Sequence, residues 1–318
     1  MKLKTLPTFG RYLKAKFGTK VAKIPVGLSG FTCPNIDGTV AKGGCTFCLN
    51  ESFSPNLAKD AKITLNLKST KNPLLEQQLR ELDLQIRTTQ KMMTTQGVKK
   101  FLVYFQSFTN TYAPFETLKT LYDKALSYPD VIGLSIGTRS DSVTDEVLDY
   151  LVILSQTKEI WIEFGVQSVF DKTLEKINRG HDAANAKEAV LKAKAKDLNV
   201  CAHLIFGLPG ESQEMMLTTA KEVYSWGVDA IKYHPLYVVK NTLLANEYKA
   251  GEFTPITKEE YAQTLIKAIE LKPKHILIQR MTAGISDDTL LAPAWCGWNK
   301  NAMVAYINKA LRQAGWKI

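Results

Sequence analysis

The sequence predicts an α/β fold, a partial parallel (β/α)6 barrel with terminal extensions. Short, nearly continuous apolar segments recur along the chain, as is typical of strands buried on both faces of a parallel sheet. Helical patterns separate these segments, so strand, helix and strand alternate about six times, and such crossovers cover a sheet with helices. The 318 residues, 45% hydrophobic and 23% charged, are typical of a globular protein.

Seven segments rich in β-branched and apolar residues are the predicted strands. They lie at residues 21–28, 100–106, 131–137, 159–166, 199–206, 230–236 and 275–280. We expect residues 20–240 to form the core of the barrel and residues 241–318 to complete or flank it. No low-complexity linker divides the chain, so we expect a single domain.

Side-chain signals mark the starts of several helices. Asn72, followed by a proline, predicts an N-cap ahead of apolar residues that share one helix face. Thr257 and Glu260 form a predicted capping box, and Ser212 is a predicted N-cap. Residues 50–71 are polar and have no clear period, which predicts a long loop.

The composition argues against several classes of protein. No apolar stretch approaches the roughly 20 residues that a membrane-spanning helix needs. The basic residues 1–18 lack the apolar region and the small-residue cleavage site of a signal peptide, so we expect a cytoplasmic protein. The net charge of +10 favours a polyanionic partner such as nucleic acid.

Three of the five cysteines crowd together, at Cys33, Cys45 and Cys48. In a reducing compartment a tight cysteine group indicates metal binding or catalysis rather than a disulfide framework. The group lies in SGFTCPNIDGTVAKGGCTFC, directly after the first predicted strand, where β/α barrels build their active sites. Three thiolates can hold three irons of a four-iron cluster, which leaves the fourth iron without a protein ligand.

The spacing alone fits a zinc site equally well. In that alternative Cys45 and Cys48 form a knuckle, and Cys33 with a histidine completes the four ligands. The four histidines are scattered, at positions 181, 203, 234 and 275. A third alternative, an electron-transfer cluster, needs a fourth cysteine, and neither Cys201 nor Cys296 has a close-spaced partner.

The cysteine segment resembles that of the YhcC/YtqA-like radical S-adenosylmethionine (SAM) proteins, relatives of the Elongator catalytic subunit. In that family the first two cysteines are separated by about eleven residues, as they are here. Further motifs of the resemblance follow in order along the chain: QSFTNTYAP at 106–114, GTRSD at 137–141, EFGVQS at 163–168, NRGH at 178–181, HLIFGLPGE at 203–211, HPLYVVKNT at 234–242 and APAWCGW at 292–298. Their occurrence in this order is specific.

The resemblance implies a partial radical SAM barrel with a 4Fe-4S cluster on Cys33, Cys45 and Cys48 and with SAM at the open iron. It also implies that Gln167 contacts the SAM ribose and that Arg179 contacts the SAM carboxylate, which suits a fork-shaped guanidinium. The alternative is structural, with Arg179 exposed on a helix surface and Gln167 capping the next helix.

Two further sets of SAM contacts are expected. Relatives carry a glycine-rich turn after the second strand for the SAM amino group; this chain has no such glycines, and Ser107, Thr109 and Asn110 are the candidates in their place. These residues also fit a polar turn that ends a strand. His203 occupies a strand position where relatives place a ribose contact, and a core histidine is the alternative.

Cationic residues near the strand ends are candidates for binding an anionic substrate group. They are Arg139, Lys232, His234 and Arg280. Glu163 lies within a predicted buried strand, and a buried carboxylate requires a partner. We expect Glu163 to face SAM or to pair with Arg139 or Lys232.

Members of the resembling family process the C5 side chain of the tRNA wobble uridine. The resemblance implies conversion of a carboxymethylaminomethyl group to an aminomethyl group, begun by hydrogen abstraction from a side-chain carbon, with flavodoxin or ferredoxin as the electron donor. The basic net charge agrees with a tRNA substrate. Two alternatives stay open: a radical SAM enzyme acting on a small metabolite, and a zinc-stabilised RNA-binding protein without catalysis.

Overall fold

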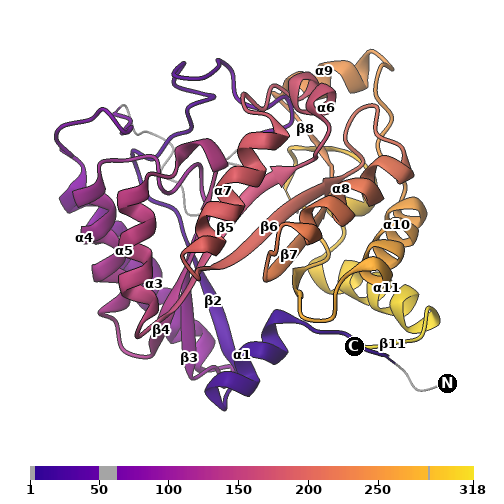
Figure 1. Ribbon diagram of the computed structural model, residues 1–318. Coiled ribbons are helices and arrows are strands. Elements are labelled where there is room, and N and C mark those ends of the chain that lie inside the picture. Colours follow the sequence, from indigo (N-terminus) through magenta and orange to yellow (C-terminus); the bar gives the residue numbers. More distant parts are fainter. Residues whose placement is uncertain (1–3, 50–62, 286) are drawn as a thin grey trace.

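A seven-stranded parallel sheet forms the centre of the computed structural model, which describes residues 4–49, 63–285 and 287–318. The strands follow one another in the order β2 (Val21–Val26), β3 (Lys100–Phe105), β4 (Val131–Thr138), β5 (Glu159–Gln167), β6 (Asn199–Phe206), β7 (Ala230–Pro235) and β9 (Leu277–Arg280). Figure 1 shows the sheet curled into an open half-barrel. The predicted α/β fold is confirmed, and residues 241–318 supply the seventh strand.

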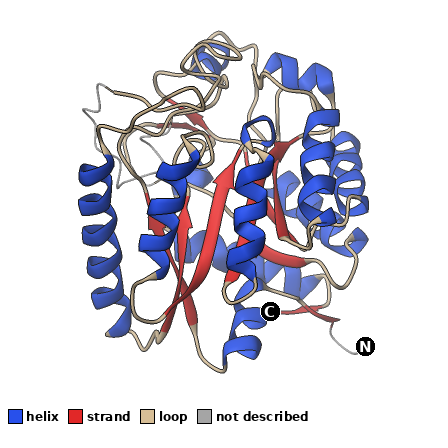
Figure 2. Ribbon diagram, turned by 60° about the vertical axis from the view of Figure 1, so that its left-hand side comes forward, coloured by secondary structure: helices blue, strands red, loops and turns tan. Residues whose placement is uncertain are grey.

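Helices cover the outer face of the sheet, as Figure 2 shows. They are α3 (Leu75–Thr94), α4 (Phe115–Leu126), α5 (Asp145–Ser155), α7 (Ala183–Ala195), α8 (Gln213–Ser225) and α10 (Lys258–Leu271). Strand β5 illustrates why: Ile160, Ile162 and Phe164 belong to the main apolar core, whereas Trp161 belongs to a separate cluster inside the barrel. Among the described residues, none of the helices has the length and apolar character to cross a membrane.

The remaining elements lie at the ends and along the mouth of the barrel. They are β1 (Lys4–Thr5), α1 (Phe9–Phe17), η1 (Ser140–Ser142), α6 (Asp171–Lys176), β8 (Val238–Val239), α9 (Leu243–Lys249), β10 (Leu290–Ala292), η2 (Ala294–Gly297), α11 (Lys300–Gln313) and β11 (Trp316–Lys317). Strand β1 pairs with β11, so the two ends of the described chain lie side by side.

Two of the three predicted helix caps are confirmed. The Thr257 side chain accepts from the backbone N–H of Glu260, whose carboxylate accepts from the backbone of Thr257, and Ser212 caps α8. The Asn72 prediction was wrong by two positions: its side chain accepts from the N–H of Leu74 in a turn that precedes α3. Of the predicted long loop, residues 50–62 lie outside the described residues, and residues 63–71 form neither helix nor strand.

Helix α1 fills the lower end of the barrel, beneath the sheet in Figure 1. Phe9 and Leu13 pack on Trp161, and the rings of Phe9 and Trp161 meet edge to face with their centroids 4.9 Å apart. The helix contacts both β2 and β9, the edge strands of the sheet. The lower part of the lumen is therefore an apolar core that α1 completes.

A layer of polar side chains crosses the lumen above this apolar cluster. At its centre is the fully buried carboxylate of Glu163, which accepts hydrogen bonds from Lys23 (2.6 Å), Lys232 and Ser135. Nε2 of His203 lies 2.9 Å from the same carboxylate. We refer to these five residues as the Glu163 layer. It confirms the expected pairing of Glu163 with Lys232.

Ion pairing determines the charge of this layer. Burial alone would raise the pKa of Glu163, but Lys23 and Lys232 outweigh it and hold that pKa well below its ordinary value. A carboxylate whose folded-state pKa is lowered stabilises the protein above its unfolded pKa of about 4.3, and this stabilisation is lost as the pH falls through the folded-state pKa. At neutral pH Glu163 is therefore a charged anchor for two lysines.

Replacing Glu163 by Gln should lower the free energy of unfolding by about 3 to 5 kcal/mol, because the buried ammonium of Lys232 and the partly buried ammonium of Lys23 would lose their counter-charge. Lys192→Ala, which removes a surface ion pair with Asp145, is the control and should cost less than about 1 kcal/mol. Urea unfolding of both variants at pH 7 measures the difference. Equal, small losses would mean that the layer does not hold the barrel together.

Candidate active site

A cavity of about 1300 Å³ runs along the lumen, and Lys23 and His203 of the Glu163 layer form part of its wall. Its wall includes the three clustered cysteines, the upper ends of the strands and part of α11. Among the predicted site residues, those that line it are Cys33, Cys45, Cys48, Thr109, Arg139, Gln167, Arg179, His203 and Arg280. The structure thus brings residues from nearly the whole chain to one space.

The cysteine loop folds back on itself between its first and second cysteines. The N–H of Ile36 donates to the carbonyl of Cys33 (2.7 Å), and Asp37 forms an isolated bridge with Lys42. The N–H of Gly44 donates to the carbonyl of Asn35 (2.8 Å). This compact turn lets eleven intervening residues separate two cysteines that line the same cavity.

The NRGH segment holds this loop in place. The Asn178 side-chain amide donates to the carbonyls of Lys42 (3.0 Å) and Gly44 (2.7 Å), and the Asn35 amide donates to the carbonyl of Asn178. Gly180 has φ +79°, and a Cβ there would lie 2.2 Å from the side-chain oxygen of Asn35. Both the positive φ and the close approach of Asn35 require a glycine at this position.

Arg179 is buried beside the cysteines. Its Nη2 donates to the carbonyl of Gly165 (2.7 Å), its Nη1 donates to Sγ of Cys45 (3.6 Å), and its Nε has no partner among the described residues. Only 6% of the residue is exposed. The alternative of an exposed helix-surface arginine is therefore wrong.

Gln167 ends β5 in a left-handed backbone conformation, with φ +70°. A Cβ on Gly165 would lie 2.6 Å from Nε2 of Gln167 and 2.9 Å from Nη2 of Arg179, so this glycine lets both side chains come together. The alternative helix-capping role of Gln167 is also wrong: Phe170 is the N-cap of α6, without a side-chain bond, and its N–H donates to the Ser168 hydroxyl (3.1 Å).

The turn after β3 replaces the missing glycines with a strained residue. Phe108 has φ +60°, a conformation that glycine adopts easily. Thr109 lines the cavity, and its N–H donates to the carbonyl of Thr32 (3.2 Å) in the cysteine loop. The Asn110 side chain donates instead to the carbonyl of Gly137 (2.9 Å), and Ser107 is buried outside the cavity lining.

The cysteine sulfurs do not fit a shared zinc ion. Thiolates on one tetrahedral zinc stand about 3.8 Å apart, because each Zn–S bond is about 2.3 Å. Across the described part of the chain, ligand atoms of three histidine, cysteine or acidic residues lie within 4.8 Å of one another only at Glu163, Cys201 and His203. A cubane binds each thiolate on a different iron and therefore suits the wider spacing of the three clustered cysteines.

The electrostatics of this cysteine group also suit a cationic cluster. Burial, and then the neighbouring Cys45 and Cys33, raise the pKa of the Cys48 thiol, whereas Arg179 and Arg139 lower it. Three thiolates that repel one another in a buried site need a positive group between them. Iron bound there would supply that charge, and the two arginines would add to it.

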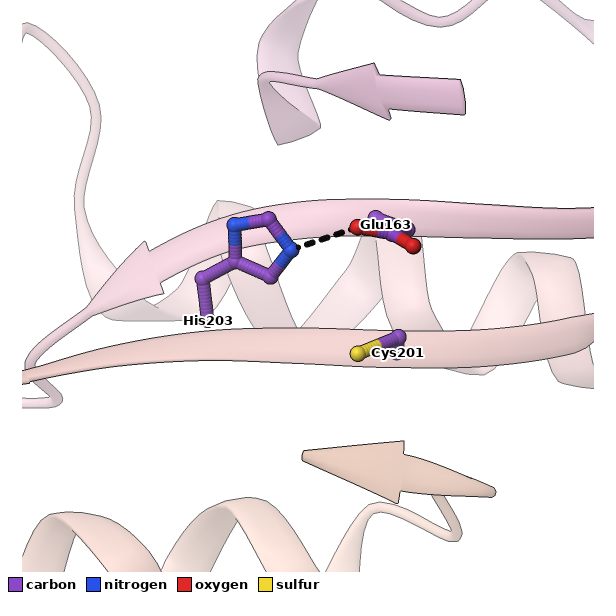
Figure 3. Close-up of side chains that lie close together, drawn as sticks. All are labelled: Glu163, Cys201 and His203. Carbon is purple, nitrogen blue, oxygen red and sulfur yellow. Dashed lines mark hydrogen bonds and ion pairs between the residues drawn. The ribbon is translucent and has the colours of Figure 1, made fainter. Parts of the chain in front are cut away.

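Glu163, Cys201 and His203, two of which belong to the Glu163 layer, are a poor metal site (Figure 3). Lys23 and Lys232 already occupy both carboxylate oxygens, and two ammonium groups would repel a metal cation. Burial, and then the charge of Lys232, lower the pKa of His203 to about 4, so its ring is neutral at pH 7.

The predicted substrate cations have three different environments. Arg139 binds Asp141 with two hydrogen bonds, of 2.9 and 2.5 Å, so its partner is Asp141 and not Glu163. Lys232 is buried within the Glu163 layer and does not line the cavity. Arg280 lines the cavity, is exposed and has no ion pair within the described residues. Of the three, only Arg280 is an uncompensated cation.

Sequence reasoning missed two structural contributors. Lys23 joins the Glu163 layer, and its signal was a lysine within the otherwise apolar strand VAKIPV. Asn178 holds the cysteine loop, and no local pattern predicts that contact across more than 130 residues.

Comparison with known families gives two matches that together span most of the chain. Residues 38–223 match the model of the radical SAM superfamily. Residues 228–313 match the model of the radical SAM C-terminal domain. The boundary between the two models falls just before β7.

Several curated proteins are similar to the chain. Protein YhcC of Escherichia coli K12 is 38% identical over 96% of this chain and 93% of its own length. Protein YtqA of Bacillus subtilis is 35% identical over 97% of this chain and 90% of its own length. The tRNA uridine(34) acetyltransferase of Methanocaldococcus infernus is 31% identical over 48% of this chain and 29% of its own length.

Among solved structures, the fold is similar to that of archaeal Elp3 from Methanocaldococcus infernus. The TM-score is 0.61 with 19% sequence identity, over 93% of this chain and 64% of that one. At this identity the likeness concerns the fold, and it agrees with the observed half-barrel.

Proposed function

The chain belongs to the radical SAM superfamily, and from this premise we propose that it remodels the C5 side chain of the tRNA wobble uridine, converting carboxymethylaminomethyl to aminomethyl. The step would balance as loss of one hydrogen atom and then one electron, taken up by the oxidised cluster, from the carboxymethyl methylene to give an imine. Water would hydrolyse the imine, so that the amine stays on the uridine and the two carbons leave as glyoxylate. The superfamily assignment makes the chain a radical SAM enzyme whose cofactors are a 4Fe-4S cluster and SAM. The observation that carries the proposal is the cavity, because one wall bears the cysteine group and another bears the uncompensated Arg280.

The proposed cluster ligands are Cys33, Cys45 and Cys48. Their wide spacing and their shared position on the cavity wall support this assignment. When bound, the cluster supplies the electron that cleaves SAM and releases a 5′-deoxyadenosyl radical. The loop turn and the contacts of Asn178 hold the backbone that carries Cys33 and Cys45, which supports this assignment.

The proposed SAM contacts are Arg179, Gln167, Thr109 and His203, all of which line the cavity. The unpartnered Nε of Arg179, next to the cysteine group, suits a carboxylate near the cluster. His203 offers a neutral ring. Ser107 and Asn110 are buried outside the cavity lining, and the Asn110 side chain donates to the carbonyl of Gly137, so we do not include them among the proposed contacts.

A tRNA substrate agrees with the net charge of +10 and with the similarity to a tRNA uridine(34) acetyltransferase. Flavodoxin or ferredoxin is the proposed electron donor, and the cytoplasm is the proposed compartment. The substrate carboxylate distinguishes this reaction from many others, because a cationic pocket recognises it far better than a neutral group.

Cys45→Ala should abolish iron loading and reductive SAM cleavage, because it removes one of three cluster ligands. Anaerobic purification and iron analysis measure the first effect, and 5′-deoxyadenosine formation measures the second. Cys201→Ala is the matched control, a buried thiol in the Glu163 layer region, and should stay brown and active. A Cys45→Ala protein that still cleaved SAM at the wild-type rate would contradict the ligand assignment.

Arg179→Ala should weaken SAM binding about tenfold to a hundredfold, since a charge-assisted hydrogen bond is worth about 1.5 to 3 kcal/mol. Equilibrium binding is measured on protein with full iron content. Arg87→Ala, on the exposed side of α3, is the control and should bind SAM normally. An unchanged dissociation constant for Arg179→Ala would make this arginine a purely structural residue.

Reduced protein with SAM should deplete carboxymethylaminomethyluridine in tRNA and form aminomethyluridine, as nucleoside analysis by mass spectrometry would show. Binding of the tRNA should weaken steeply as salt rises, because lysine and arginine contacts release counterions from phosphates. If SAM is cleaved while the nucleoside stays untouched, the tRNA proposal is wrong and a small metabolite becomes the better substrate class.

A further inference from the structure

Two buried polar atoms with no partner lie on one wall of the cavity. They are Nε2 of His234 and Nε2 of Gln279, and neither has a hydrogen bond to the described residues. Both residues line the cavity, as does Arg280. More than nine in ten buried polar groups in native proteins are hydrogen-bonded, so two orphaned nitrogens on one wall indicate a polar ligand. The Gln279 amide nitrogen can only donate, and Nε2 of His234 donates in its Nε2–H tautomer.

A β-bulge brings Gln279 and Arg280 to the same side of the sheet. Ile231 pairs with Ile278 and the next residue, Lys232, pairs with Arg280, so Gln279 is the extra residue in β9. Successive residues of a regular strand point to opposite faces, and a bulge redirects one of them. This irregularity explains why both neighbouring side chains line the cavity.

The Gln279 side chain is also fixed in its orientation. Its Oε1 accepts a hydrogen bond from Nζ of Lys23 (2.7 Å). The amide nitrogen must therefore be the orphaned atom, because a flipped amide would place its N–H groups against an ammonium. Gln279 consequently offers a donor to the cavity while its acceptor belongs to the Glu163 layer.

The surrounding charges leave this wall positive. Arg280 has no ion pair in the described part of the chain, and the carboxylate of Glu163 is already engaged by two lysines. Asp287 also lines the cavity, and its carboxylate accepts from the Thr289 side chain and backbone. His234 adds no charge at pH 7: burial, and then Arg280, hold its pKa well below its ordinary value. Its ring stacks on His203 with a centroid distance of 5.9 Å.

We infer that Arg280, Gln279 and His234 form a carboxylate subsite, which binds the carboxymethyl end of the substrate side chain. This inference rests on the proposed function and names the residues that recognise its substrate. A guanidinium binds a carboxylate through two parallel N–H donors, and the Gln279 amide and the neutral His234 ring add further polar contacts to its oxygens. The same donors suit a backbone phosphate, so the test must separate the two anions.

Two anticodon stem–loop RNAs that differ only in the wobble side chain provide that test. One carries carboxymethylaminomethyluridine and the other carries aminomethyluridine, so their phosphates are identical. Wild-type holoenzyme with SAM and no reductant should bind the carboxylated RNA about tenfold to a hundredfold more tightly. Arg280→Ala should lose this preference while binding SAM normally.

Two further variants sharpen the result. Gln279→Glu keeps an acceptor for Lys23 and places a negative charge where the amide donor was, so it should also lose the preference. Arg312→Ala, at the exposed end of α11, removes the same charge as Arg280→Ala away from the cavity lining. This control should retain the preference, with at most an equal weakening for both RNAs.

The outcomes separate the subsite from the proposed reaction. If Arg280→Ala weakens both RNAs equally, Arg280 binds phosphate and the carboxylate subsite is wrong, even when wild type turns over the RNA. If wild type and Arg312→Ala discriminate between the RNAs while Arg280→Ala and Gln279→Glu do not, the subsite stands. A failure of turnover under reducing conditions then counts against the proposed reaction alone. If wild type binds both RNAs equally, the inferred subsite is wrong.

Discussion

The buried carboxylate of Glu163 is the interaction on which the rest of the half-barrel depends. An open, curled sheet has no hydrogen bonds between its first and last strands, so side chains must connect them across the lumen. Lys23 from β2 makes that connection by binding both Glu163 and Gln279 of β9. Lys232 of β7 binds Glu163 and also the Tyr104 hydroxyl of β3 (3.0 Å). Ser135 and His203 add β4 and β6, so the layer and its contacts with Tyr104 and Gln279 connect all seven strands of the sheet.

This polar layer separates two parts of the lumen with different chemistry. Beneath it, α1 and Trp161 form an apolar plug that costs little to bury and needs no polar partners. On its other side the cavity reaches the cysteine group, and its wall mixes apolar side chains with charged ones such as Arg179 and Arg280. Breaking a buried ion pair is far more costly than losing a surface pair, so the layer gives the cavity a rigid floor. Gln167 and Phe108 have positive φ, a strained backbone conformation for residues other than glycine. Such a conformation persists only where the surrounding structure holds it in place.

The sequence was sufficient to predict the strands, because apolar runs and helix caps are local signals. The sequence was insufficient where the environment of a side chain depends on strand register or on contacts between distant parts of the chain. Arg139 was assigned to a substrate, yet its partner Asp141 lies two residues away in the same motif. Lys232 was a candidate both for binding the substrate and for pairing with Glu163, and only the packing of the lumen shows that it pairs with Glu163. The bulge at Gln279 arises from the pairing of β7 with β9, which no local pattern encodes.

Buried nitrogens without a hydrogen-bond partner lie on both sides of the cavity within the described residues, and their neighbours differ. On the β5 side, two nitrogens of Arg179 are already engaged with Gly165 and Cys45, so that wall is organised around the cysteine group before a ligand arrives. On the β7 and β9 side, His234 and Gln279 retain orphaned nitrogens next to an unpaired arginine. Leaving buried donors unsatisfied destabilises the free protein, and a bound anion would recover that free energy. The orphaned nitrogens of Arg179 and Arg139 lie beside the cysteine group, and those of His234 and Gln279 lie on the β7 and β9 side. The two sides therefore offer separate polar contacts to the proposed cofactor and to the proposed substrate.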